Sequence, residues 1–128
     1  ESVQARQAYR VVEYLLSQSQ QICRQAGVNL YIVTIPHFPP AFYKQRPGDP
    51  WSSELADGDY LLPERKLTAH GRREGLRLLP MGLRMREMGL SVTDIQALYD
   101  GEGSGHLSRS GHRFFAKQIF VSFFDGSR

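Results

Sequence analysis

Residues 29–36, with the sequence Asn29-Leu30-Tyr31-Ile32-Val33-Thr34-Ile35-Pro36, decide the fold of this chain. The run is rich in β-branched residues and almost wholly apolar, and it lacks the polar alternation of a half-exposed strand. Such a run is typical of a strand that is buried on both faces, as in a parallel sheet. Pro36 ends the strand because proline has no N–H to donate to the sheet.

Helical patterns flank this strand. Residues 2–26 repeat apolar side chains at steps of three and four, and Gly27 follows as a C-terminal stop. Residues 36–62 contain several prolines and predict a long irregular loop. The other expected elements are a helix over 63–74, a strand over 76–79, a helix over 81–88, a helical turn over 94–98 and a last helix that begins after its N-cap Ser108.

This alternation of helices and strands predicts an α/β, three-layer domain with parallel strands. At 128 residues, the chain corresponds to a single domain over 1–128. Two strands make a very small sheet, so they are expected to form one edge of a larger sheet. The apolar edge then either meets a missing half of the domain or self-associates.

Composition limits the classes of partner. Apolar residues make up 41% of the chain, the net charge is +3, and the longest apolar runs are too short to span a bilayer. Cys23 is the single cysteine, which excludes an internal disulfide, and it is predicted to be buried and inert. Acidic residues are interspersed among the central basic ones, which indicates a solvated face more than a nucleic-acid or anionic-polymer surface. These basic residues are Arg65, Lys66, Arg72, Arg73, Arg77, Arg84 and Arg86.

One motif carries chemistry: Gly105-His106-Leu107-Ser108-Arg109-Ser110-Gly111-His112-Arg113-Phe114-Phe115-Ala116. It places a histidine in a glycine-rich loop directly before an amphipathic helix, which suits a general base. The stretch resembles the C-terminal signature of the SGNH (GDSL-type) hydrolases, Asp-x-x-His-Leu-Ser/Thr-x-x-Gly-His. In that family, this histidine activates a serine that attacks esters.

The resemblance implies a flavodoxin-like parallel sheet, of which this chain would be the C-terminal portion. It implies that His106 is the general base, that the substrate is a small ester or O-acetylated compound, and that no cofactor takes part. Gly103 stands where the family has its aspartate, which leaves Asp100 and Glu102 as candidates for the acid that orients His106. The Gly-Asp-Ser nucleophile motif is absent. None of the serines considered has the family's strand-to-helix placement; they are Ser52, Ser53, Ser104, Ser108 and Ser110.

Several alternatives stay open at this level. We expect His106 at a partly exposed loop end that faces an open crevice, and His112 packed within the helix as a structural residue. No carboxylate or thiolate spacing completes a metal site with these two histidines. The loop aromatics either line a substrate pocket or pin the loop to the body; they are Phe38, Phe42, Tyr43, Trp51 and Tyr60. The alternative function is a non-catalytic α/β interaction module.

Overall fold

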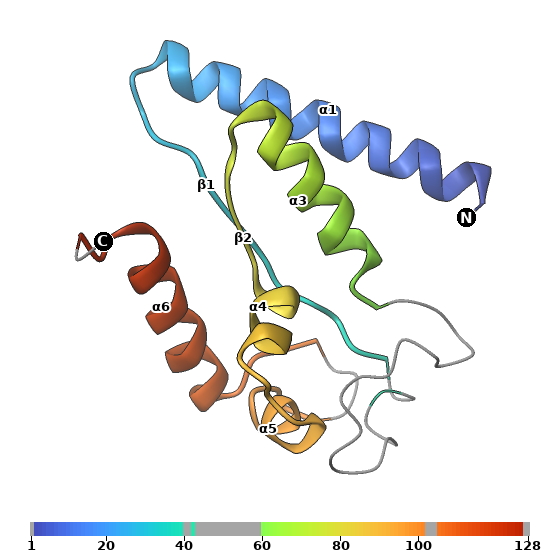
Figure 1. Ribbon diagram of the computed structural model, residues 1–128, viewed down its shortest axis with the longest axis vertical. Helices are drawn as coiled ribbons and strands as arrows, with labels where there is room; N and C mark the ends of the chain where they lie inside the picture. Colours follow the sequence, from blue (N-terminus) through green and yellow to red (C-terminus); the bar gives the residue numbers. More distant parts are fainter. Residues whose placement is uncertain (1, 40–41, 43–59, 102–104, 127–128) are drawn as a thin grey trace.

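The computed structural model describes residues 2–39, 42, 60–101 and 105–126 (Figure 1). It is a mixed α/β structure, mostly helical, with a two-stranded parallel sheet in the described residues. The elements in chain order are α1 (Val3–Gln25), β1 (Tyr31–Thr34), α3 (Leu62–Glu74), β2 (Arg77–Pro80), α4 (Met81–Glu87), α5 (Val92–Ala97) and α6 (Arg109–Phe123). Predictions on Tyr43, Trp51, Glu102, Ser52, Ser53 and Ser104 lie outside the described residues.

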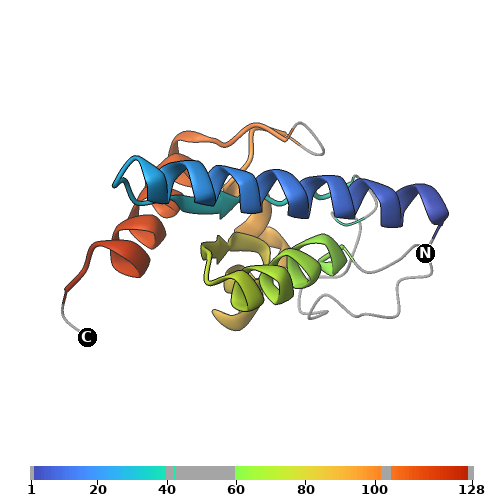
Figure 2. The ribbon, with the colours of Figure 1, turned by 90° about the horizontal axis from the view of Figure 1, so that it is seen from above.

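The sheet joins β1 to β2 in parallel, with Tyr31 opposite Arg77 and Thr34 opposite Pro80. Helix α3 makes the crossover that a parallel pair requires. Helices α1 and α3 lie on one side of the sheet and α6 lies on the other (Figures 1 and 2). The predicted order of helices and strands is therefore confirmed, with small shifts at the ends of the elements.

A buried carboxylate joins three of these elements. Glu64 of α3 is only 5% exposed, and its side chain accepts hydrogen bonds from the backbone N–H groups of Gly82 (3.0 Å) and Leu83 (2.7 Å). These donors lie in the first turn of α4, where a helix has no partners of its own for its N–H groups. Glu64 also accepts the hydroxyl proton of Thr34 at the end of β1 (2.5 Å). One side chain thus caps α4 and fastens α3 and α4 to the sheet.

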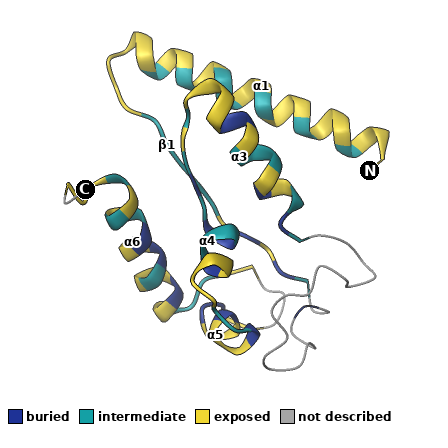
Figure 3. Ribbon diagram, viewed as in Figure 1, coloured by how far each residue is buried: buried dark blue, intermediate teal, exposed yellow. Residues whose placement is uncertain are grey.

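The hydrophobic core sits at the carboxyl end of the sheet, where α4 and α5 show much of the buried surface (Figure 3). Phe38 and Phe42 follow β1 and stack at 4.3 Å between ring centroids, and Tyr99 meets Phe38 edge-on at 6.1 Å. Both phenylalanines are at most 1% exposed. Of the two interpretations offered for the loop aromatics, these two side chains fit the one in which they pin the loop to the body.

Helix α1 departs from expectation because its apolar stripe is not buried. Val11, Leu15 and Ile22 are 53%, 56% and 63% exposed, and α1 contains no buried residue. The expectation that β1 is buried on both faces is also wrong for the described structure, since all four of its residues are only half-buried. Cys23 is likewise half-buried, not buried as predicted. These departures have the same physical reason. Periodicity shows which side chains form a stripe, but those side chains are buried only where another element covers them.

Polar side chains hold α1 against α3. The Ser17 hydroxyl lies 3.1 Å from Nε2 of the buried His70, and the Gln20 amide donates to the carbonyl of Gly75 at 3.1 Å. The Lys66 ammonium lies over the Tyr9 ring, 4.5 Å from its centroid. Helix α1 therefore contacts its neighbour largely through polar side chains, while Val11, Leu15 and Ile22 face solvent, which an ordinary amphipathic surface helix would bury.

We predict that Glu64→Gln lowers the free energy of unfolding by about 2 kcal/mol, the scale of lost hydrogen bonds to a charged group. The amide keeps one acceptor oxygen but turns an N–H₂ group toward backbone donors. Urea unfolding followed by circular dichroism measures the change. Glu74→Gln, an exposed position on the same helix, is the matched control and is expected to have little effect. Equal losses in the two variants would contradict a capping role for Glu64.

Candidate functional site

His106 lies at the neck of the loop between α5 and α6. Tyr99 and Leu107 form an antiparallel bridge across this neck, and the backbone N–H of Asp100 donates to the carbonyl of His106 at 2.9 Å. His106 is exposed, and the open crevice expected beside it stays a prediction. The loop is thus closed at its base, which fixes the backbone from which the imidazole projects.

Two serines attach this loop to the helices on either side. The Ser108 hydroxyl accepts from the backbone N–H of Gly111 at 3.1 Å, which confirms Ser108 as the N-cap of α6. The hydroxyls of Ser108 and Ser110 each donate to the carbonyl of Ala97 at 2.8 Å, at the end of α5. Both side chains are engaged in holding α6 to α5, so neither has the geometry of a free nucleophile.

Gly111 permits the close packing of the first turn of α6 against the end of α5. The residue is buried, and a Cβ atom built on it would collide with the carbonyl oxygen of Leu98. The backbone N–H of Ser108 donates to that same carbonyl at 2.9 Å. A side chain at this position would push the start of α6, and the His106 loop with it, away from α5.

His37 is a site residue that the sequence interpretation missed. It follows β1, and a Cβ atom built on Gly105 would lie 3.0 Å from its Nδ1 atom. The His37 ring therefore rests against the residue that precedes His106. The Tyr99 hydroxyl donates to the carbonyl of Pro36 at 2.7 Å and holds the loop to this segment. A histidine directly after a parallel strand was a usable signal, because open parallel sheets bind ligands at the carboxyl ends of their strands.

A capping box stabilises α5, the helix that precedes the loop. The Asp94 N–H donates to the Ser91 hydroxyl at 3.1 Å, and the Asp94 carboxylate accepts the Ser91 N–H at 2.9 Å. A hydrogen bond from the Ser91 hydroxyl, and then the one from its N–H, lower the pKa of Asp94. This cap is therefore fully formed above the ordinary carboxyl pKa, and its contribution is lost as the pH falls through the lowered value.

The predicted site residues come together only in part. Asp100 is exposed and meets His106 through the backbone, whereas Glu102 lies outside the described residues. The expectation that His112 packs within the helix is wrong, because its side chain points outward from the first turns of α6 and is exposed. In the part of the chain that the structure describes, no three His, Cys, Asp or Glu side chains gather as metal ligands, and no helix is long and apolar enough to cross a membrane.

Several of the central basic residues make contacts within the chain. Arg77 donates to the Tyr31 hydroxyl at 2.8 Å and lies over its ring, while Arg73 approaches Glu13 at 3.8 Å. These contacts spread positive charge among acidic and aromatic partners, as expected of a solvated face and not of a phosphate-binding stripe.

Comparison with known proteins identifies no relative of this chain. No protein-family model, curated protein or solved structure matches this chain.

We predict that Gly111→Ala destabilises the protein by about 1–3 kcal/mol, the usual cost of overpacking. In an open helix, the same change from glycine stabilises by up to about 1 kcal/mol, so the sign of the effect is diagnostic. Gly71→Ala is the matched control, because a Cβ atom on this other buried helical glycine would make ordinary contacts at 3.6 Å. Thermal unfolding compares the two. A Gly111→Ala protein as stable as the Gly71→Ala protein would show that α6 does not need the close approach to Leu98.

Proposed function

We propose that this chain is the C-terminal portion of an SGNH-type ester hydrolase or O-acyltransferase, with His106 as the general base. One observation supports the proposal most: the imidazole projects from a closed loop neck that Ser108 and Gly111 anchor to the start of an amphipathic helix. The loop is also tied, through Tyr99 and Pro36, to the segment that follows β1. This tie supports the proposal, because open parallel α/β sheets bind ligands at the carboxyl ends of their strands.

In the proposed reaction, His106 accepts the hydroxyl proton of a serine as that serine attacks the ester carbonyl. The proton then passes to the departing alcohol, which leaves an acyl-enzyme. His106 next takes a proton from water or from an acceptor hydroxyl as that oxygen attacks the acyl group. His106 then returns the proton to the departing serine oxygen, which restores the free enzyme. The substrate is a small ester or an O-acetyl group, and Asp100 or Glu102 is the acid that orients the imidazole.

The serine comes from a polypeptide segment outside this chain. Of the serines near His106, Ser108 and Ser110 are bound to the Ala97 carbonyl. The same missing half would supply further strands of a flavodoxin-like, three-layer sheet beside β1. The exposed stripe of α1 supports this part of the proposal. If α1 led from a further parallel strand to β1, it would be a crossover helix and would bury that stripe against the sheet.

The exposed stripe equally favours a second candidate, a non-catalytic α/β module that assembles with another chain through α1 and the edge of β1. The two functions differ in whether His106 affects turnover. The first requires an activated serine in the assembled protein, whereas the second requires only binding.

We predict that His106→Ala lowers esterase turnover at least about 10²-fold, the scale of a lost general base. The protein assayed is the whole enzyme, in which this chain is joined by the segment that supplies the serine. The matched control is His112→Ala, which deletes a second exposed imidazole in the same segment and is expected to leave turnover nearly unchanged. Hydrolysis of p-nitrophenyl acetate measures both. This chain alone is expected to be inactive, and a fluorophosphonate probe is expected to label none of its serines.

An assembly that shows no esterase or acyltransferase activity would remove the catalytic role. So would a folded His112→Ala protein that is as impaired in turnover as His106→Ala. Either result would favour the interaction module.

We further predict that the isolated chain self-associates through the α1 stripe and the free edge of β1. Leu15→Lys places a charge in the stripe and is expected to shift the population toward monomer in sedimentation velocity. Gln18→Lys adds the same charge to an exposed polar position on the same helix and serves as the control. A parent chain that stays monomeric at high concentration would contradict the prediction.

A further inference from the structure

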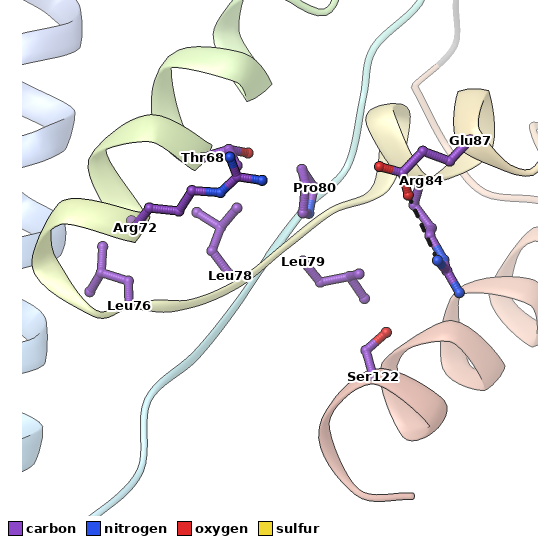
Figure 4. Close-up of a pocket in the computed structure, with 10 residues that line it drawn as sticks. Thr68, Arg72, Leu76, Leu78, Leu79, Pro80, Arg84, Glu87 and Ser122 are labelled. Carbon is purple, nitrogen blue, oxygen red and sulfur yellow. Dashed lines mark ion pairs between the residues drawn. The ribbon is translucent and has the colours of Figure 1, made fainter. Parts of the chain in front are cut away.

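A groove runs along the edge of β2 that does not face β1. Its volume is about 460 Å³, within the range of small-molecule sites. In Figure 4, leucines of β2 and the residue before it lie between two walls, one made by Thr68 and Arg72 of α3 and the other by Arg84 and Glu87 of α4 with Ser122 of α6. None of the residues assigned to the His106 site lines this groove.

The charges of the groove select a monoanion. Arg72 and Arg84 stand on opposite walls, and Glu87 offsets one of their two charges. Arg84 is held in place, because its Nε–H donates to the buried Gln118 at 3.3 Å and its guanidinium approaches Glu87 at 3.7 Å. Arg72 is exposed and makes no such contact with the described residues, so its planar fork is available for a carboxylate.

Thr68 adds an independent observation. Its hydroxyl oxygen is buried and has no hydrogen-bond partner among the described residues. Buried polar atoms nearly always have a partner. The oxygen is shielded from solvent in this rotamer, so a ligand in the groove would complete the bond only after the Thr68 side chain turns toward it. Thr68 and Arg72 are four residues apart on α3 and therefore line the same wall.

The floor of the groove is apolar. Leu76, Leu78 and Leu79 line it together with Pro80. Leu79 is already buried, but a ligand that is only a small ion would leave the half-buried Leu76 and Leu78 in water, whereas an alkyl or aromatic chain would cover them. We propose that the groove binds a monocarboxylate that carries an apolar chain, with the carboxylate on Arg72 and Thr68 and the chain along the leucines. This site stands apart from the proposed esterase function and does not depend on it.

Titration of the ¹⁵N-labelled full chain with sodium octanoate, followed by NMR, tests this site. We expect saturable shifts of the Gly71, Leu78 and Leu79 amides. Acetate supplies the charge without the chain and octanamide supplies the chain without the charge, so both are expected to bind at least about tenfold more weakly. Octanamide that binds as tightly as octanoate would overturn the proposal, as would the absence of saturable shifts.

Substitutions on α3 test where the carboxylate of octanoate binds. Arg72→Gln is expected to weaken octanoate binding about tenfold or more, the scale of a charge-assisted hydrogen bond. The neighbouring Arg73→Gln removes the same charge from a residue that faces Glu13 instead, and is expected to bind normally. Thr68→Val is expected to weaken binding without lowering the unfolding temperature, because it removes an unpaired hydroxyl. If Arg72→Gln and Arg73→Gln weakened octanoate binding equally, the loss would come from net charge alone, and the proposed site would be refuted.

Discussion

The Glu64 carboxylate is the interaction on which the other elements depend. It lies in α3, but its partners are at the end of β1 and in the first turn of α4. Gly82 is the residue that permits this approach, since a Cβ atom there would lie 2.7 Å from Leu61 and 2.9 Å from the Glu64 carboxylate. A buried carboxylate is tolerable only when its oxygens are hydrogen-bonded, and two backbone N–H groups and a hydroxyl supply those bonds. The geometry of the carboxyl end of the sheet follows from this one group.

Helix α1, in contrast, docks through polar side chains and leaves apolar side chains exposed. Its polar residues dock it on α3, through Ser17 and Gln20, while Leu15 and Ile22 face solvent. An amphipathic helix in a complete domain buries its apolar stripe, because that burial is the larger source of stability. The contact with α3 therefore leaves Leu15 and Ile22 of the apolar stripe exposed, and the proposed partner surface rests on that exposure. Strand β1 is paired only with β2 among the described residues, so its other edge also has no strand beside it.

Local signals predicted much of the fold, and long-range contacts account for what they missed. Pro36 after the strand, Gly75 after α3 and Ser108 before α6 each act on neighbouring residues, so their effects are readable in the sequence. The partners of Glu64 are 18 to 30 residues away, and nothing in the local pattern distinguishes it from an exposed helical glutamate. His37 differs, because its place shortly after β1 is a local signal, although only the folded loop brings it to Gly105.

The motif around His106 includes residues that the fold itself requires. Ser108 caps α6, and Gly111 allows the helix to touch the Leu98 carbonyl, so both would be kept for packing alone. The contact that closes the loop neck at His106 uses its backbone carbonyl, which any residue would provide. That contact does not depend on which side chain stands at position 106. The case for chemistry at this loop therefore rests on the imidazole of His106 and not on the length of the motif that surrounds it.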